Sequence, residues 1–146
     1  MRLSLISRSV PVCAVILGMK AMCCELSAGD WTQFRGSTGT AVAATNDKLP
    51  LDISPEKHVL WRTELPSGHS SPIVIGQRIF VTAVRDKRLV TIGLDRATGK
   101  IQWEAEAPYE KLEPIHRIGS HAQSSPCADE ERVYSFFGSC GLHCYD

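Results

Sequence analysis

The sequence predicts an all-β fold in which two similar antiparallel sheets follow one another along the chain. Its apolar runs are short, rich in Val, Ile, Phe, Tyr and Trp, and bounded by Gly, Pro, Asp or Ser, which is typical of strands and turns. No segment carries apolar residues at helical spacing over three turns. Several short motifs also occur twice, which indicates an internal repeat.

The composition fits one folded domain and excludes some classes of partner. The chain has 146 residues, of which 43% are hydrophobic, with 16 basic and 16 acidic side chains. This balanced charge gives no electrostatic reason to expect nucleic acid or an anionic membrane as a partner. Apolar runs stay shorter than the roughly 18 residues that a spanning helix needs, so no membrane span is predicted.

Residues 1–29 have the pattern of a secretory signal peptide. Arg2 and Arg8 give a positive start, residues 10–19 form an apolar core, and the small residues Ser27, Ala28 and Gly29 precede the expected cleavage. The alternative is a buried or frayed N-terminal segment. The signal interpretation predicts export, to the periplasm or the cell exterior.

Three cysteines, Cys127, Cys140 and Cys144, follow the predicted signal peptide. An odd number in an exported protein leaves at least one thiol unpaired or paired outside the chain. The sequence does not determine their pairing. The Cys140–Cys144 spacing matches no haem attachment motif, and no metal site is predicted.

The remaining chain divides into an irregular lead-in and a strand-rich part. Residues 30–56 have few strand features, residues 57–146 hold the expected strands, and residues 108–123 form a polar insertion. The expected strands are 59–64, 71–75, 78–84, 88–94, 101–105, 132–137 and 142–145. Tight turns are expected at residues 76–77, 85–87 and 138–141.

The chain repeats a Ser-Ser-Pro motif together with the strand that follows it. Residues 70–72 recur as residues 124–126, 54 residues later. Arg78-Ile79-Phe80 falls on Arg132-Val133-Tyr134 at the same shift. Separate elements that share one shift indicate a repeated structural unit.

Two further correspondences complete the unit. Trp61 recurs as Trp103 after 42 residues, and Leu94-Asp95 recurs as Tyr145-Asp146 after 51. One unit therefore has four strands, namely a Trp strand, a Ser-Ser-Pro strand, an Arg-apolar strand and a strand that ends in Asp. A four-stranded unit of about 40 residues has the size of one propeller blade, which stacks on similar neighbours.

The segment that joins the two units combines a turn and an indole. Asp95 and Thr98 can accept backbone N–H bonds within the turn, and Gly99 supplies the left-handed backbone. Trp103 follows on the next strand, where a large flat ring fits between adjacent sheets. This Asp-x-x-Thr-Gly-Lys-x-x-Trp motif resembles the tryptophan-docking motif of quinoprotein-type β-propellers, whose units are the pyrroloquinoline-quinone (PQQ)-like repeats.

The resemblance implies a partial propeller of about two four-stranded antiparallel blades that does not close. Residues 57–103 are assigned to the first blade and residues 103–146 to the second, incomplete blade. Residues 30–36 resemble the lead-in of exported bacterial proteins with these repeats. Because even a four-bladed ring needs about 160 residues, we expect an N-terminal fragment of a longer propeller or a truncated product. A self-sufficient small β-sandwich is the further alternative.

Candidate binding residues flank the two Ser-Ser-Pro strands, which by blade order line the central channel. They are His69, Ser70, His121, Gln123 and Ser124. Hydrated polar residues at strand starts are the simpler interpretation. A partner, whether a protein or a small ligand, is expected at this channel wall or at the propeller edges.

No catalytic residue is predicted. Quinoprotein dehydrogenases hold PQQ with Ca²⁺ through carboxylate and amide oxygens, whereas the acidic residues here fall mainly in turns, such as Asp86, Asp95 and residues 129–131. No cofactor is expected in this chain. PQQ with Ca²⁺ is expected only in a full-length homologue. The sequence thus favours an exported binding or assembly scaffold. The alternative is the N-terminal part of a PQQ-dependent oxidoreductase whose cofactor site lies in further blades.

Overall fold

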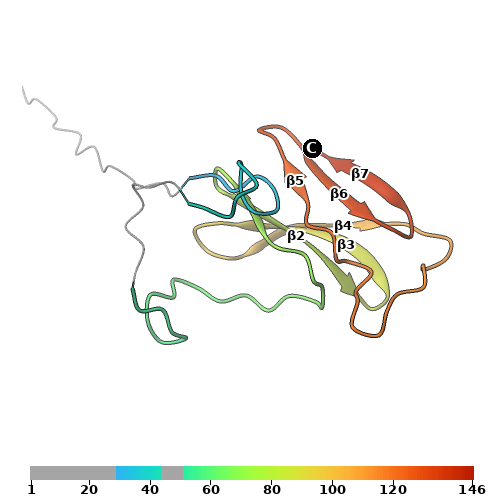
Figure 1. Ribbon diagram of the computed structural model, residues 1–146, viewed down its shortest axis with the longest axis horizontal. Coiled ribbons are helices and arrows are strands. Elements are labelled where there is room, and N and C mark those ends of the chain that lie inside the picture. The colour runs from blue at the N-terminus through green and yellow to red at the C-terminus, as the bar shows by residue number, and fades with distance from the viewer. Residues whose placement is uncertain (1–28, 44–50) are drawn as a thin grey trace, which may run out of the picture.

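The computed structural model describes residues 29–43 and 51–146, which form two antiparallel sheets and no helix (Figure 1). The predicted fold class, an all-β partial propeller that is not closed, is confirmed. The first sheet consists of β1 (Ile73–Ile75), β2 (Arg78–Arg85), β3 (Arg88–Asp95) and β4 (Ile101–Ala107) in that order. The second consists of β5 (Cys127–Ala128), β6 (Val133–Phe137) and β7 (Gly141–Tyr145). The predicted signal peptide lies almost wholly outside the described residues.

The strands group differently from the unit predicted from the sequence. That unit begins with the Trp61 strand, but the fourth strand of the first sheet is β4, which carries Trp103. Residues 59–64 run along the first sheet without pairing as a strand. The second sheet has three strands rather than four. The first blade therefore begins after the segment that carries Trp61 and ends with β4, the strand that carries Trp103.

Two tight turns fold the first sheet as predicted. Gly76, with a φ of 53°, leads from β1 into β2. Asp86 and Lys87 join β2 to β3 with φ values of 50° and 67°, and two successive positive φ angles match the twist of a two-residue hairpin. The resulting β2–β3 register runs unbroken from Arg78 opposite Asp95 to Arg85 opposite Arg88.

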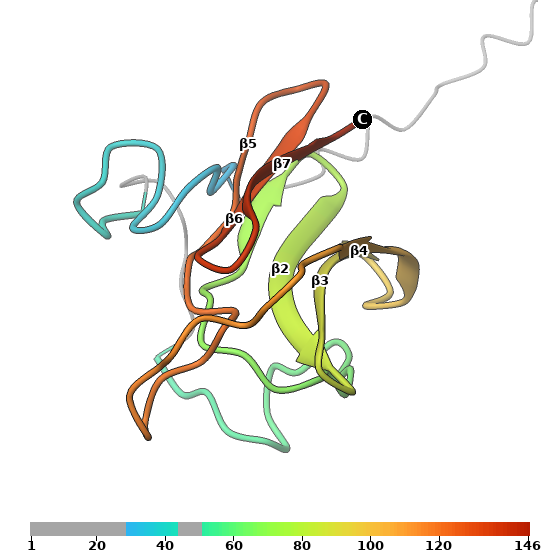
Figure 2. The same cartoon turned by 90° about the vertical axis from the view of Figure 1, so that its right-hand side faces the viewer.

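The two sheets pack face to face around an apolar core. In Figure 2, β5, β6 and β7 lie over one side of β2 and β3. Ile73 and Phe80 of the first sheet cluster with Val133 of the second. Farther along the interface, Leu89 clusters with Phe137. All five side chains are at most 3% exposed, so this interface is the centre of the molecule.

One polar pair crosses the middle of this apolar interface. The Thr91 hydroxyl on β3 donates to Oγ of Ser135 on β6 at 2.9 Å, and both residues are fully buried. A buried hydroxyl without a partner carries a large desolvation cost, so the two groups must face each other. The pair therefore fixes the position of one sheet on the other.

The lead-in joins the inner edges of the two sheets. Trp31 exchanges two backbone hydrogen bonds with Val74 of β1, of 2.7 and 2.8 Å. The next residue, Thr32, accepts a bond of 3.0 Å from the backbone N–H of Ala128 on β5. These lead-in residues therefore pair with the edge strands β1 and β5 of the two sheets. Their irregular sequence gave no reason to predict this role.

The Thr91–Ser135 pair gives a direct test of the sheet interface. We expect Thr91→Val or Ser135→Ala to lower the free energy of unfolding by about 1–3 kcal/mol, because each leaves one buried hydroxyl unpaired. The double variant should lose less than the sum of the two single losses. Urea denaturation of the four proteins measures this coupling, and strictly additive losses would contradict the contact.

Candidate functional site

The five predicted binding residues belong to two segments that run side by side. The backbone N–H of His69 donates to the carbonyl of Ala122 at 2.9 Å, so that His121 and Gln123 flank this bond. Gly68 allows this segment to lie close to β2, because a Cβ there would lie 2.7 Å from the carbonyl oxygen of Thr82. The structure thus brings the two halves of the predicted set together.

The serines of this set are engaged within the fold. Ser70 Oγ donates to the carbonyl of Thr82 at 2.9 Å and accepts from its N–H at 3.0 Å. The carbonyl of Ser124 accepts a bond of 2.9 Å from the Thr82 hydroxyl. Ser125, which was not a candidate, accepts from the backbone N–H of Ser71 at 2.8 Å. The Ser-Ser-Pro segments are therefore held in place by the hydroxyls of Ser70 and Ser125 and by the carbonyl of Ser124.

The remaining candidates offer polar groups beyond these internal bonds. His69 and Gln123 are exposed. His121 is half-buried, and its Nδ1 atom is buried without a hydrogen-bond partner among the described residues. We call His69, His121 and Gln123 the polar rim.

The Asp95 turn has the hydrogen bonds predicted for it. Oδ1 of Asp95 accepts from the Thr98 hydroxyl at 2.6 Å and from the Thr98 N–H at 2.8 Å. These bonds stabilise the carboxylate and hold the pKa of Asp95 below its ordinary value. Gly99 closes the turn with a φ of 69° and donates its N–H to the Asp95 carbonyl at 2.8 Å.

This turn receives the indole of Trp61 from the segment that precedes the first sheet, a contact that the sequence analysis did not predict. Nε1 of Trp61 donates to the carbonyl of Arg96 at 2.9 Å, and the ring lies where a Cβ of Gly99 would be. The neighbouring Thr63 hydroxyl donates to the Gly99 carbonyl at 2.6 Å. The recurrence of Trp61 as Trp103 was the available signal, but it does not say which turn each ring meets.

Trp103 itself lies between the two sheets. Its ring centroid is 5.7 Å from that of Phe80 on β2 and 5.9 Å from that of Tyr145 on β7, both in tilted arrangements. Gly93 on the neighbouring strand lacks the Cβ that would overlap this indole. Burial raises the pKa of Tyr145.

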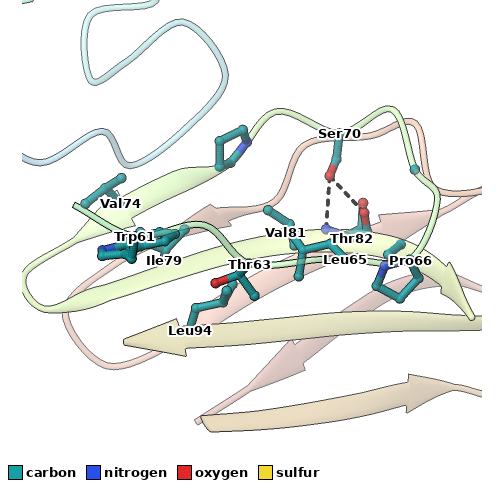
Figure 3. Close-up of a pocket in the computed structure, with 13 residues that line it drawn as sticks. Trp61, Thr63, Leu65, Pro66, Ser70, Val74, Ile79, Val81, Thr82 and Leu94 are labelled. Atoms are coloured by element: carbon teal, nitrogen blue, oxygen red, sulfur yellow. Dashed lines mark hydrogen bonds between the residues drawn. The ribbon is translucent and has the colours of Figure 1, made fainter. Parts of the chain in front are cut away.

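A largely apolar cavity of about 420 Å³ lies on the far face of the first sheet (Figure 3). Trp61 and Leu65 line one wall, and Ile79, Val81 and Leu94 of β2 and β3 line the other. The predicted binding residue Ser70 also lines it, but no residue of the polar rim does. The cavity and the polar rim are therefore separate features.

The carboxylates do not fit a calcium–quinone centre. Asp95 is bound within its turn, and Asp129 accepts from the N–H groups of Glu131 and Arg132 and from the Tyr134 hydroxyl. These bonds lower the pKa of Asp129. Nowhere in residues 29–43 and 51–146 do three or more His, Cys, Asp or Glu side chains gather as metal ligands. Cys127, Cys140 and Cys144 are free thiols.

A turn that docks the indole of an earlier segment, followed by a second sheet built from the same motifs, defines a PQQ-like propeller-repeat protein. The chain belongs to the family described as outer membrane protein assembly factor BamB, and the match covers residues 12–146. The comparisons with the curated proteins and with the solved structures give no match. The described part of the chain has no helix long and apolar enough to span a membrane.

Because Trp61 docks over Gly99, we expect alanine to destabilise the fold more at Gly99 than at Gly76. Gly76→Ala should cost about 1–2 kcal/mol of unfolding free energy, because its φ is positive but its surroundings are open. Gly99→Ala adds an overlap with the indole and should cost about 1–3 kcal/mol more.

Denaturant titration of both variants, repeated in a Trp61→Ala background, separates the two causes. Removing the indole should lower the cost of Gly99→Ala toward that of Gly76→Ala, and the part that remains reflects the Thr63 hydroxyl, which lies 2.7 Å from the same Cβ position. Equal costs of the two substitutions in the presence of Trp61 would exclude the docking contact.

Proposed function

We propose that this chain is an exported propeller-repeat protein that serves as a binding scaffold in the assembly of another protein. Its family carries the description of an outer membrane protein assembly factor, which supports a role in protein assembly. Within the described residues, no group of three or more His, Cys, Asp or Glu side chains could hold a metal ion, so no metal centre argues for a catalytic role instead. Export brings the scaffold to the periplasm or the cell exterior.

The contacts of the lead-in support cleavage after Gly29. Oδ1 of Asp30 accepts a bond of 2.8 Å from the backbone N–H of Gly76, and Trp31 pairs with β1. Removal of residues 1–29 leaves all these contacts intact. The positive start, the apolar core and the small residues before Asp30 have the order of a signal peptide.

The observation that carries the binding role is the alignment of the two Ser-Ser-Pro segments. Their hydroxyls bond to the neighbouring backbone, whereas His69 and Gln123 stay exposed on either side of the His69–Ala122 bond. Imidazole and amide groups donate and accept hydrogen bonds, which suits the backbone and polar side chains of a protein partner. The polar rim is thus a pre-positioned hydrogen-bonding surface.

Export is tested by the N-terminus of the mature protein. We expect N-terminal sequencing of the exported chain to begin at Asp30, and Gly29→Arg to leave the precursor uncut, because a bulky residue does not fit the cleavage position. Thr38→Arg, an exposed substitution nearby, is the matched control and should be processed normally. An uncut wild-type chain retained in the cytoplasm would disprove export.

The binding role is tested by photo-crosslinking from the polar rim in cells. A photoreactive residue at His69 or Gln123 should capture one discrete protein, identified by mass spectrometry. The same residue at Ile118, which is 71% exposed in a nearby loop, should not capture it. Equal capture from all three positions, or none from the rim, would argue against this binding surface.

A further inference from the structure

The second repeat unit contains an insertion that the first unit lacks. Pro66 corresponds to Pro108 at a shift of 42, whereas Ser70 corresponds to Ser124 at a shift of 54. The difference between these shifts is the twelve residues 109–120, which we call the strap; it belongs to the orange segment between β4 and β5 in Figure 2. Because the first unit makes the same connection without it, the fold itself does not require the strap, and added loops of this kind often carry function.

In the first unit, the connection lies against its own sheet. The carbonyl of Ser67 accepts a bond of 2.7 Å from the backbone N–H of Val84 on β2. The Ser70 hydroxyl bonds to both the N–H and the carbonyl of Thr82 on the same strand. Gly68 lies so close to this strand that a Cβ would be 2.7 Å from the Thr82 carbonyl oxygen. The first connection thus continues the edge of its own sheet beyond β1.

The second connection does not repeat this arrangement. By the shift of 54, His121 corresponds to Ser67 and Gly138 corresponds to Val84. Within the described residues, no backbone hydrogen bond joins His121 to Gly138. The second sheet therefore lacks the pairing that holds the first connection.

Three hydrogen bonds instead join the second connection to the first unit. They run from the His69 N–H to the Ala122 carbonyl, from the Thr82 hydroxyl to the Ser124 carbonyl, and from the Ser71 N–H to the Ser125 hydroxyl, at 2.9, 2.9 and 2.8 Å. All three acceptors belong to residues 122–125, and all three donors belong to the first unit. The connection that follows the strap is therefore transferred from its own sheet to the neighbouring one.

The strap lies where the second connection would otherwise pair. The carboxylate of Glu113 lies against Gly138, so close that a Cβ on this glycine would overlap both carboxylate oxygens. The backbone N–H of Glu113 also donates to Oγ of Ser139 at 3.0 Å. The strap thus occupies the end of β6, at the position where the end of β2 receives Ser67.

The strap is also anchored to the first sheet and to the core. The hydroxyl of Tyr109 donates to the carbonyl of Lys87 in the β2–β3 turn at 2.8 Å. Tyr109 and Leu112 pack against the buried cluster that contains Leu89 of β3 and Phe137 of β6. The strap therefore bridges the β2–β3 turn of the first sheet and the β6–β7 turn of the second.

Ala122 links the strap to the polar rim. It is fully buried in the same cluster, and its carbonyl accepts the bond from His69 that brings the rim together. Ala122 corresponds to Gly68, whose position against its own sheet leaves no room for a Cβ. A methyl group at this position therefore opposes the arrangement of the first unit and favours the transferred one.

We propose that the strap and the methyl group of Ala122 position the polar rim, because together they transfer residues 121–125 from the second sheet to the first. This transfer brings His121 and Gln123 beside His69, whereas pairing with β6 would place them along their own sheet. The inference rests on the proposed function and deepens it, since it identifies what assembles that binding surface.

A minimal connection tests this proposal in the full chain. Deletion of residues 109–120 together with Ala122→Gly leaves Pro-His-Gly-Gln-Ser-Ser-Pro, which matches the Pro-Ser-Gly-His-Ser-Ser-Pro of residues 66–72. We expect this connection to pair with β6 as the first connection pairs with β2. In hydrogen exchange followed by NMR, the His69 amide should then exchange at least about tenfold faster and the Gly138 amide at least about tenfold slower.

Photo-crosslinking relates this rearrangement to binding. Capture of the partner protein from position 69 should fall at least about tenfold in the minimal-connection variant, although this position lies outside the altered segment. A folded variant in which the His69 amide stays protected would overturn the proposal. It would also be overturned if the protection moved from His69 to Gly138 and capture stayed unchanged.

If the minimal-connection variant does not fold, a milder variant decides the question. Tyr109→Phe with Ser139→Ala removes the two hydroxyls that anchor the strap. The loss of these bonds should speed exchange of the His69 amide at least about fivefold. Tyr134→Phe with Ser37→Ala is the matched control, because it removes two hydroxyl hydrogen bonds outside the strap. Equal exchange rates of this amide in the two variants would contradict the proposal.

The proposed function and this inference can fail separately. The hydrogen-exchange measurements need no partner, so they report on the position of residues 121–125 whether or not a protein is captured. A wild-type rim that captures no protein would refute the binding role, whereas the exchange rate of the His69 amide would still decide what the strap positions.

Discussion

The indole of Trp61 lies over Gly99, and its nitrogen donates a hydrogen bond to the carbonyl of Arg96. The ring needs a backbone without a Cβ beneath it and a carbonyl oxygen at its nitrogen, and the Asp95 turn supplies both. That turn also sets where β4 begins, because Asp95 and Lys100 bond across it. The rest of the architecture depends on this contact, since β4 then carries its own indole to the interface with the second sheet.

Much of the fold could be predicted from local patterns, but the grouping of strands could not. The hairpin turns and most strands depend on short stretches of sequence, such as Asp86-Lys87 between two apolar runs. A repeat, however, can be divided at any point, and sequence alone does not say whether a Trp strand opens one blade or completes another. The hydrogen bond from Trp61 to Arg96 joins residues 35 positions apart. Its acceptor is a backbone carbonyl, which every residue has, so the sequence does not indicate which residue accepts the bond.

The candidate site shows a similar limit. The recurrence of Ser-Ser-Pro indicated two equivalent segments, and hydrogen bonds join them. Residue type could not show that Ser70 bonds to β2. In the sequence, a serine whose hydroxyl bonds to the backbone of a neighbouring strand cannot be distinguished from a serine that binds a ligand. Burial separates these roles, since Ser70 is partly enclosed whereas His69 and Gln123 are exposed.

The two outer edges of the molecule differ in how they resist the addition of another strand. β4 carries Glu104 and Glu106, which pair with Arg85 and Arg88 at 2.8 and 3.8 Å. Such exposed ion pairs add little stability, but charges along an edge oppose further pairing. β7 contains no Asp, Glu, Lys or Arg, and it exposes apolar surface beside its edge. In a protein built from repeats, an edge without charges is suited to pairing with an outer strand of the kind that β4 adds to the first sheet.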